Sequence, residues 1–221
     1  MADTLAAAGR ARILDPIDRI SELLFGLFMV LSFTGTLSVI DSGRDEVRDM
    51  LVAAIGCNLA WGFVDGVMFV LRNIVARGRK ATLLRAVRGA REPAQAQRLI
   101  GDELGPLADA LRPAELERMR QWLVAQPASA APRVALTAAD LKGAIAVFLL
   151  VFLSTFPVVL PFVFIADAGL AKRVSAAVAI AMLYVCGYAW GRYAGFKAGR
   201  TGAVMVLLGA AIEAVVIALG G

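Results

Sequence analysis

The chain has 221 residues, of which 59% are hydrophobic, and its mean hydropathy is +0.73. This composition excludes an ordinary soluble domain and predicts an integral membrane protein. The formal net charge is +5, but no nucleic-acid-reading motif accompanies it, so we expect no nucleic-acid partner. The sequence contains no histidine, no phosphate-binding loop and no nucleophile elbow, which argues against an enzyme.

Five apolar stretches are each close to the ~20 residues that a helix needs to cross the hydrocarbon of a bilayer. They cover residues 21–40, 51–71, 142–165, 174–195 and 202–219. The sequence therefore predicts an all-α membrane protein with five transmembrane helices. Residues 1–20 show no cleavable signal pattern, so we expect a cytoplasmic N-terminal segment followed by a span that serves as its own insertion signal.

A small helical insert is expected between the second and third spans. The predicted organisation is residues 1–20, the first two spans in 21–71, the insert in 72–140, and the last three spans in 141–221. Within the insert we expect short helices at residues 81–91, 94–100 and 113–126. Thr137 and Asp140 have the spacing of a capping pair at the start of the third span.

The insert begins with a run of basic residues that sets the orientation. This run consists of Arg72, Arg77, Arg79, Lys80, Arg85, Arg88 and Arg91. The loop 41–49 is acidic in balance. The asymmetry predicts a cytoplasmic insert and N-terminus, with the C-terminus on the other side. It also predicts that the basic insert attracts anionic lipid.

Two carboxylates lie inside predicted spans, Asp65 in the second and Glu213 in the fifth. A charge at mid-bilayer costs at least ~2.5 kcal/mol, which favours a functional use. Asn58 and Met68 share a helix face with Asp65, and the first span offers Glu22 and Met29. Carboxylates suit hard divalent cations and a thioether favours softer transition metals, so we expect these six residues to form a metal site.

Simpler roles remain open for several of these residues. Met29 and Met68 would also serve as gap-filling side chains. Glu213 would also serve as a structural partner for Arg192 or Lys142, and Glu22 lies at a span edge that water reaches.

Small residues on the fourth span predict close helix contact. Gly187, Gly191 and Gly195 recur at every fourth position, which favours assembly as a homodimer through the membrane helices. Cys57 and Cys186 lie inside spans without paired spacing, so we expect them to be packing residues and not a disulfide or zinc pair.

Several of these features resemble the vacuolar iron transporter (VIT) family. The likeness lies in the five spans, the helical insert, and local sequences at residues 156–162, 187–192, 201–202 and 207–210. The resemblance implies a homodimer that moves Fe²⁺ or Mn²⁺ out of the cytoplasm in exchange for protons, with the metal as substrate and no bound cofactor. The chain departs from the family in that Asp65-Gly66 lies in the second span and not the first, and in that the insert is basic, with Met119 as its only methionine.

Two functions of different classes are therefore kept. The first is a divalent transition-metal transporter. The second is a membrane scaffold or accessory protein without transport activity, which docks partners through its basic insert.

Overall fold

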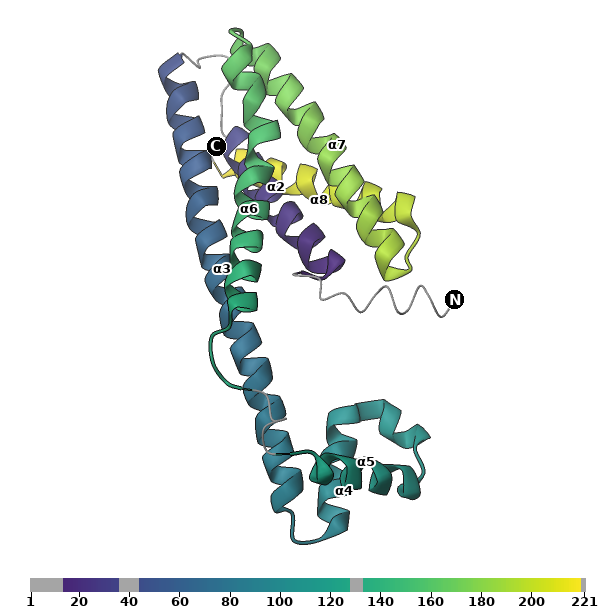
Figure 1. The fold of residues 1–221 in the computed structure, drawn as a ribbon. Coiled ribbons are helices and arrows are strands. Elements are labelled where there is room, and N and C mark those ends of the chain that lie inside the picture. Colours follow the sequence, from purple (N-terminus) through teal and green to yellow (C-terminus); the bar gives the residue numbers. More distant parts are fainter. Residues whose placement is uncertain (1–13, 36–43, 128–132, 220–221) are drawn as a thin grey trace, which may run out of the picture. The chain divides into compact units, whose positions relative to one another are not determined.

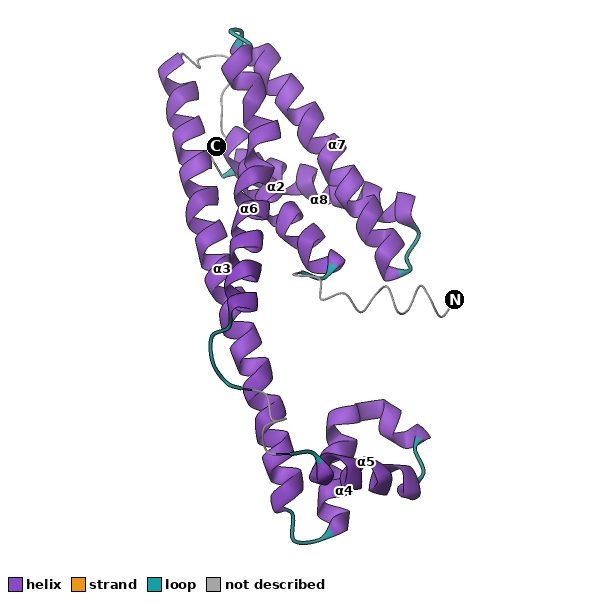
Figure 2. Ribbon diagram, in the orientation of Figure 1, coloured by secondary structure: helices purple, strands orange, loops and turns teal. Residues whose placement is uncertain are grey.

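The structure is a computed structural model, and it describes residues 14–35, 44–127 and 133–219. Figure 1 shows its elements in chain order, and in Figure 2 the described residues form helices and loops without strands. The all-α prediction is thereby confirmed. The helices are α2 (Pro16–Gly35), α3 (Arg44–Gly89), α4 (Pro93–Leu104), the 3₁₀ helix η1 (Gly105–Ala110), α5 (Pro113–Ala125), α6 (Ala138–Phe164), α7 (Ala168–Ala194) and α8 (Ala198–Ala218).

Four described helices are long and apolar enough to cross a membrane, namely α3, α6, α7 and α8. They contain the predicted second span and all but the last residue of the predicted third, fourth and fifth spans, consistent with an integral multi-pass membrane protein. The predicted first span is not among them. Its residues 36–40 lie outside the described part of the chain, and the described helix α2 carries Asp18, Arg19 and Glu22 near its start, which shortens its uncharged stretch.

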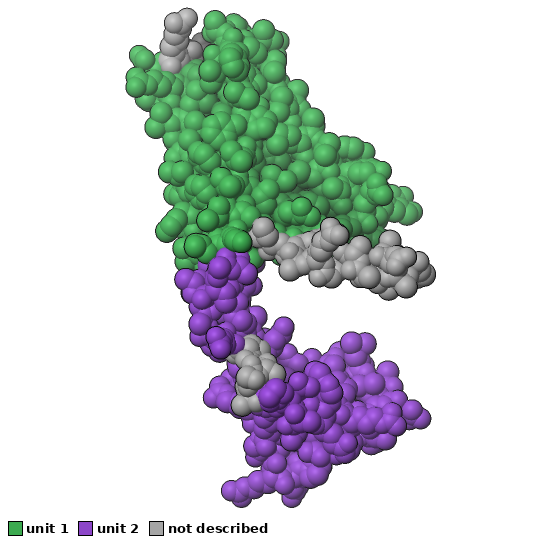
Figure 3. All heavy atoms as spheres, in the orientation of Figure 1, with its two compact units in different colours: residues 1–69, 141–221 green, residues 70–140 purple. Residues whose placement is uncertain are grey.

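The chain forms two compact units, coloured separately in Figure 3. Unit 1 comprises residues 1–69 and 141–221, and unit 2 comprises residues 70–140. Helix α3 contributes residues to both units.

The core of unit 1 forms where α2 packs against α7 and α8. Leu27, Val30, Val158 and Leu183 are almost fully buried there and form part of one packed apolar cluster. A hydrogen bond also connects two of the helices. The hydroxyl of Ser175 on α7 donates to the Val158 carbonyl of α6 at 2.6 Å.

The small residues of α7 contact α8 of the same chain. A Cβ at Gly187 would lie 2.7 Å from Met205 Cγ and 2.9 Å from Gly202 Cα. Gly195 ends α7 in the left-handed conformation, with φ of 77°, which glycine adopts without strain. The glycine repeat thus explains an intrachain hairpin, and the inference from it to a homodimer loses its basis.

We predict that Gly187→Leu destabilises unit 1 by about 2 kcal/mol, because the added side chain overpacks a contact that has no room. Thermal unfolding followed by circular dichroism in detergent measures the loss. Gly199→Ala is the matched control, since its Cβ would meet Tyr184 Oη at 3.7 Å, an ordinary contact. Equal unfolding temperatures for both variants would contradict the tight α7–α8 packing.

Unit 2 has a small core of its own. Val87, Ala96 and Ile100 are buried, and Leu116 and Met119 pack against them. The short helix expected at residues 81–91 is not separate, because α3 continues to Gly89. Between the membrane stretch and Gly89 the sequence contains no proline and is rich in Arg, Ala and Leu, which favour helix, so nothing ends the helix earlier.

Several of the basic residues expected to face lipid have partners within unit 2, and those of Arg77 and Arg88 are the most extensive. The guanidinium of Arg77 donates to both carboxylate oxygens of Asp140, at 2.9 and 2.7 Å. Thr137 and Asp140 form the predicted cap, because Asp140 N donates to Thr137 Oγ1 while Thr137 N donates back to Asp140 Oδ2. Arg88 donates to the carbonyls of Leu123 and Gln126 at the C-terminal end of α5. Arg77 and Arg88 therefore stabilise the unit itself.

Glu117 on α5 is the centre of a second polar network in unit 2. Arg120 donates to both of its carboxylate oxygens, at 2.8 and 2.7 Å, and Gln97 and Gln121 donate at 2.8 and 2.9 Å. These donors stabilise the charged form, Arg120 most of all, and lower the pKa of Glu117 from its ordinary 4.5 to about 2.

The lowered pKa predicts how stability depends on pH. The stabilisation by Glu117 is fully present above pH 4.5 and is lost as the pH falls towards 2, because the unfolded chain binds the proton first. Glu117→Gln should flatten the decline in stability over this window, measured by chemical unfolding of the full chain at a series of pH values. Glu92→Gln, an exposed acid of the same unit, serves as the control. A profile in Glu117→Gln as steep as in the wild type would refute the role of the network.

Candidate functional site

Asn58 of α3 lies at the junction of three helices in unit 1. It is fully buried, and its Nδ2 donates to the Gly26 carbonyl of α2 at 3.3 Å and to Thr155 Oγ1 of α6. The Oδ1 atom of Asn58 is buried and accepts no hydrogen bond from the described residues. The side chain thus links α2, α3 and α6 and retains a vacant acceptor oxygen.

Small residues let these helices approach. A Cβ at Gly26 would clash with Ser154 Oγ and lie 2.7 Å from the Val151 carbonyl of α6. Next along α3, Cβ atoms at Gly62 and Gly66 would lie 3.1 Å from the Phe148 carbonyl and 3.0 Å from the Ala144 carbonyl. The backbone of α3 therefore contacts α6 closely at Gly62, before Asp65, and at Gly66, directly after it.

The side chains on the predicted polar face of α3 differ in solvent exposure, from fully buried to almost half exposed. At 3.6 residues per turn, Asp65, Trp61 and Met68 lie about 20°, 60° and 80° around the helix from Asn58. Asn58 is fully buried and Asp65 is half-buried, while Trp61 and Met68 are 43% and 47% exposed. Trp61 packs edge-on against Phe25 of α2, with ring centroids 5.8 Å apart. Asp65 thus lies at the boundary between the helix contact and the outer surface of unit 1.

Two predicted residues come from α2. Glu22 and Met29 are both half-buried, about one turn on either side of Gly26. The contacts of Phe25 with Trp61 and of Gly26 with Asn58 show that α2 and α3 run in opposite directions here. Glu22 and Asp65 therefore lie on the same side of the Asn58 junction.

Glu213 lies elsewhere. A Cβ at Gly35 would be 3.2 Å from Glu213 Cγ, so Glu213 of α8 lies beside the C-terminal end of α2. Gly35 is nine residues from Gly26, about 13 Å along the helix. The Nζ of Lys172 donates to the Gly35 carbonyl at 3.4 Å, so this basic residue lies near the same helix end. Among the described residues, Glu213 forms no ion pair with Arg192 or Lys142.

Taken together, the structure gathers Asn58, Asp65 and Glu22 towards one region and separates Glu213 from them. Within residues 14–35, 44–127 and 133–219, no three Asp, Glu, Cys or His side chains are grouped closely enough to hold a metal ion. The six predicted residues therefore do not form a single cluster within this part of one chain.

Sequence reasoning missed the partners of Asn58. Thr155 accepts the bond from Asn58, whereas its neighbour Ser154 donates to the Val151 carbonyl of its own helix. Both are buried polar residues in a stretch of α6 that is otherwise apolar. Hydroxyls in a membrane helix commonly bond across to another helix. The presence of polar residues in an apolar stretch was therefore the sequence signal that could have indicated a contact between helices.

No family model matches the chain, and no curated protein matches it.

We predict that Asn58→Leu destabilises unit 1 by about 1 kcal/mol, the usual size of an interhelical hydrogen bond in a membrane protein. The change removes the donor to Gly26 and Thr155. Thermal unfolding in detergent measures the effect. Ser32→Ala is the control, because among the described residues the bond of Ser32 Oγ is to the Phe28 carbonyl of its own helix. A variant as stable as the wild type would show that the junction does not hold the helices together.

Proposed function

We propose that the protein is a membrane transporter of divalent transition-metal cations, Fe²⁺ or Mn²⁺, and a diverged relative of the vacuolar iron transporter family. The observation that carries the proposal is the position of Asp65. It is a carboxylate on a helix long and apolar enough to cross the membrane, two turns from the vacant amide oxygen of Asn58.

The physical argument is the cost of a carboxylate in hydrocarbon. A charge there is costly and marks an ion pathway by default. A divalent cation is stabilised by carboxylate and amide oxygens, and the thioethers of Met29 and Met68 add affinity for the softer transition metals. Asp65 is the central ligand of the proposed site, with Asn58 and Met68 from α3 and Glu22 and Met29 from α2. Glu213 belongs to a separate step of the pathway, near the other end of α2.

A homodimer would complete such a site. The described residues of one chain do not gather three acidic ligands, whereas a second copy doubles the number of carboxylates. Trp61 and Met68, which flank Asp65, are almost half exposed and leave room for this contact. The proposed pathway therefore lies between two subunits.

The proposed direction is export from the cytoplasm by exchange with protons. Its support is the positive-inside rule, which assigns the N-terminus and the basic residues of unit 2 to the cytoplasm. Arg79, Lys80, Arg85 and Arg91 are exposed on unit 2 and are the residues proposed to meet anionic lipid.

Asp65→Asn should abolish metal-dependent uptake, because it keeps the shape of the side chain and removes its charge. The measurement is Mn²⁺ or Fe²⁺ flux into proteoliposomes, with and without a pH gradient. We expect a reduction of at least about tenfold, since a charged ligand contributes at least the ~1.4 kcal/mol that corresponds to this factor.

Asp49→Asn is the matched control, since Asp49 is an exposed carboxylate near the start of the same helix. It should transport like the wild type. Wild-type flux in Asp65→Asn would place the site elsewhere, and a wild-type protein without metal flux would refute the transporter proposal. Glu213→Gln in parallel tests whether the second acid belongs to the pathway.

A docking role is the second candidate, and the surface of unit 2 favours it. Leu107 and Trp122 are 70% and 63% exposed although the unit has its own core. Such residues are typical of protein contacts. Co-purification that is lost in Trp122→Ala, together with the absence of metal flux, would favour a scaffold over a transporter.

A further inference from the structure

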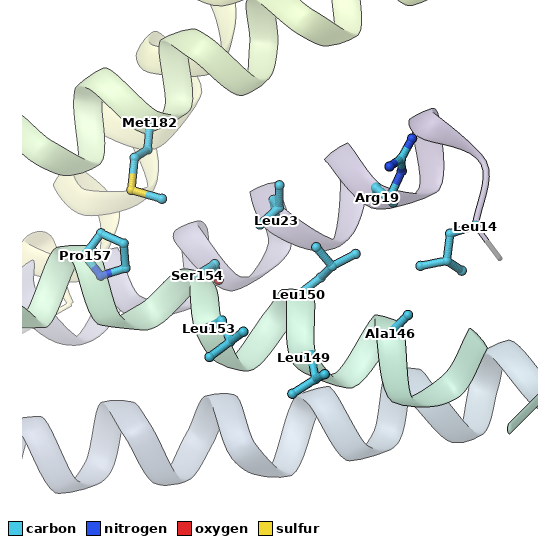
Figure 4. A pocket seen from close by; sticks show the side chains of 10 residues that line it. All are labelled: Leu14, Arg19, Leu23, Ala146, Leu149, Leu150, Leu153, Ser154, Pro157 and Met182. Atoms are coloured by element: carbon cyan, nitrogen blue, oxygen red, sulfur yellow. The ribbon is translucent and has the colours of Figure 1, made fainter. Parts of the chain in front are cut away.

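An apolar cleft in unit 1 has no role in the proposed transport. It lies between α2, α6 and α7, and Figure 4 shows the side chains that line it. Its volume is about 670 Å³, within the range of sites that hold small ligands. Its lining includes the apolar residues Leu23, Leu150, Leu153 and Met182 and the hydroxyl residue Ser154, and Arg19 lies at one end.

The length of the cleft matches one leaflet of a bilayer. It extends along α6 from Ala146 to Pro157, which at 1.5 Å per residue is about 16 Å. The hydrocarbon of one leaflet is about 15 Å thick, half of the ~30 Å core. Since α6 is one of the helices suited to cross the membrane, a cleft of this length along it fits a single acyl chain.

The charges at the end of the cleft fit a headgroup. Arg19 is exposed in the first turn of α2, and its guanidinium forms no hydrogen bond or ion pair with another described residue. Asp15 and Asp18 lie within four residues of it, and Asp15 Oδ1 accepts a bond from Ile17 N. Arg19 can pair with a phosphate, and the neighbouring Asp15 and Asp18 can pair with an amine. The two carboxylates would repel a headgroup that is purely anionic, so the charges fit a headgroup that carries both a phosphate and an amine.

We propose that this cleft binds a phospholipid of the ethanolamine class. One acyl chain lies between α2, α6 and α7, the phosphate accepts hydrogen bonds from Arg19, and the ammonium group faces Asp15 and Asp18. Guanidinium and phosphate form a strong charge-assisted pair, and burial of the acyl chain against leucines adds the apolar contribution.

Native mass spectrometry of the full chain, equilibrated with equal amounts of phosphatidylethanolamine and phosphatidylglycerol, tests the proposal. The wild type should retain phosphatidylethanolamine in preference. Arg19→Gln should lower its occupancy about tenfold, as expected for the loss of a charged hydrogen bond. Arg173→Gln, an exposed base that does not line the cleft, should leave the occupancy unchanged.

A second pair of variants tests the acyl chain. Leu153→Trp fills the cleft and should also lower retention, whereas Leu160→Trp, at an exposed position of the same helix outside the cleft, should not. Circular dichroism confirms that each variant is folded. Wild-type retention in both Arg19→Gln and Leu153→Trp, or a preference for phosphatidylglycerol, would overturn the proposal. Stronger lipid binding after removal of residues 1–13 would overturn it too, because the chain's own N-terminal segment would then be the occupant.

Discussion

The hydrogen bonds of one buried amide determine how the helices of unit 1 meet. Within hydrocarbon a polar side chain finds no water, so Asn58 is stable only where other helices supply its partners. The Gly26 carbonyl and the Thr155 hydroxyl supply them, and the missing Cβ of Gly26 makes the approach of α6 possible. The same contact fixes the rotation of α3. Asp65, two turns further on, then lies beside α6 and not in open lipid or in the core.

The proposed transport depends on this arrangement. An acid on a helix that faced only lipid would have no ligands near it, and an acid in a sealed core would be out of reach of an ion. Asp65 is half-buried, with Glu22 on the same side of the Asn58 junction and the half-exposed Trp61 and Met68 beside it. Asp65 therefore lies next to the close contact of α3 with α6, at the edge of the exposed surface of unit 1.

Much of the fold could be predicted from local sequence patterns. Hydropathy located four helices suited to span a membrane, and the spacing of Thr137 and Asp140 predicted their cap. These features depend on residues close together in the chain. The contacts that define the site join residues far apart in the chain. Asn58 and Thr155 are separated by 97 residues, and no periodicity within one helix reveals such a pair.

Other features that the sequence left open share this cause. The glycine repeat of α7 predicted that a helix packs closely there, but not that the partner is α8 of the same chain. The basic run after the second span was assigned to lipid as a whole, yet Arg77 and Arg88 bind Asp140 and the end of α5 within unit 2. For the candidate site, composition identified the acids in the spans, but the separation of Glu213 from Asp65 depends on tertiary packing.

Binding of Mn²⁺ to the full chain in lipid nanodiscs, followed by electron paramagnetic resonance, tests the central claim most directly. The free ion gives a six-line spectrum, whose intensity falls when protein ligands replace its water. The account predicts saturable binding by the wild type and by Asp49→Asn, and its loss in Asp65→Asn. If the wild type leaves the signal of the free ion unchanged, or if Asp65→Asn binds as the wild type does, Asp65 is not the centre of a cation site.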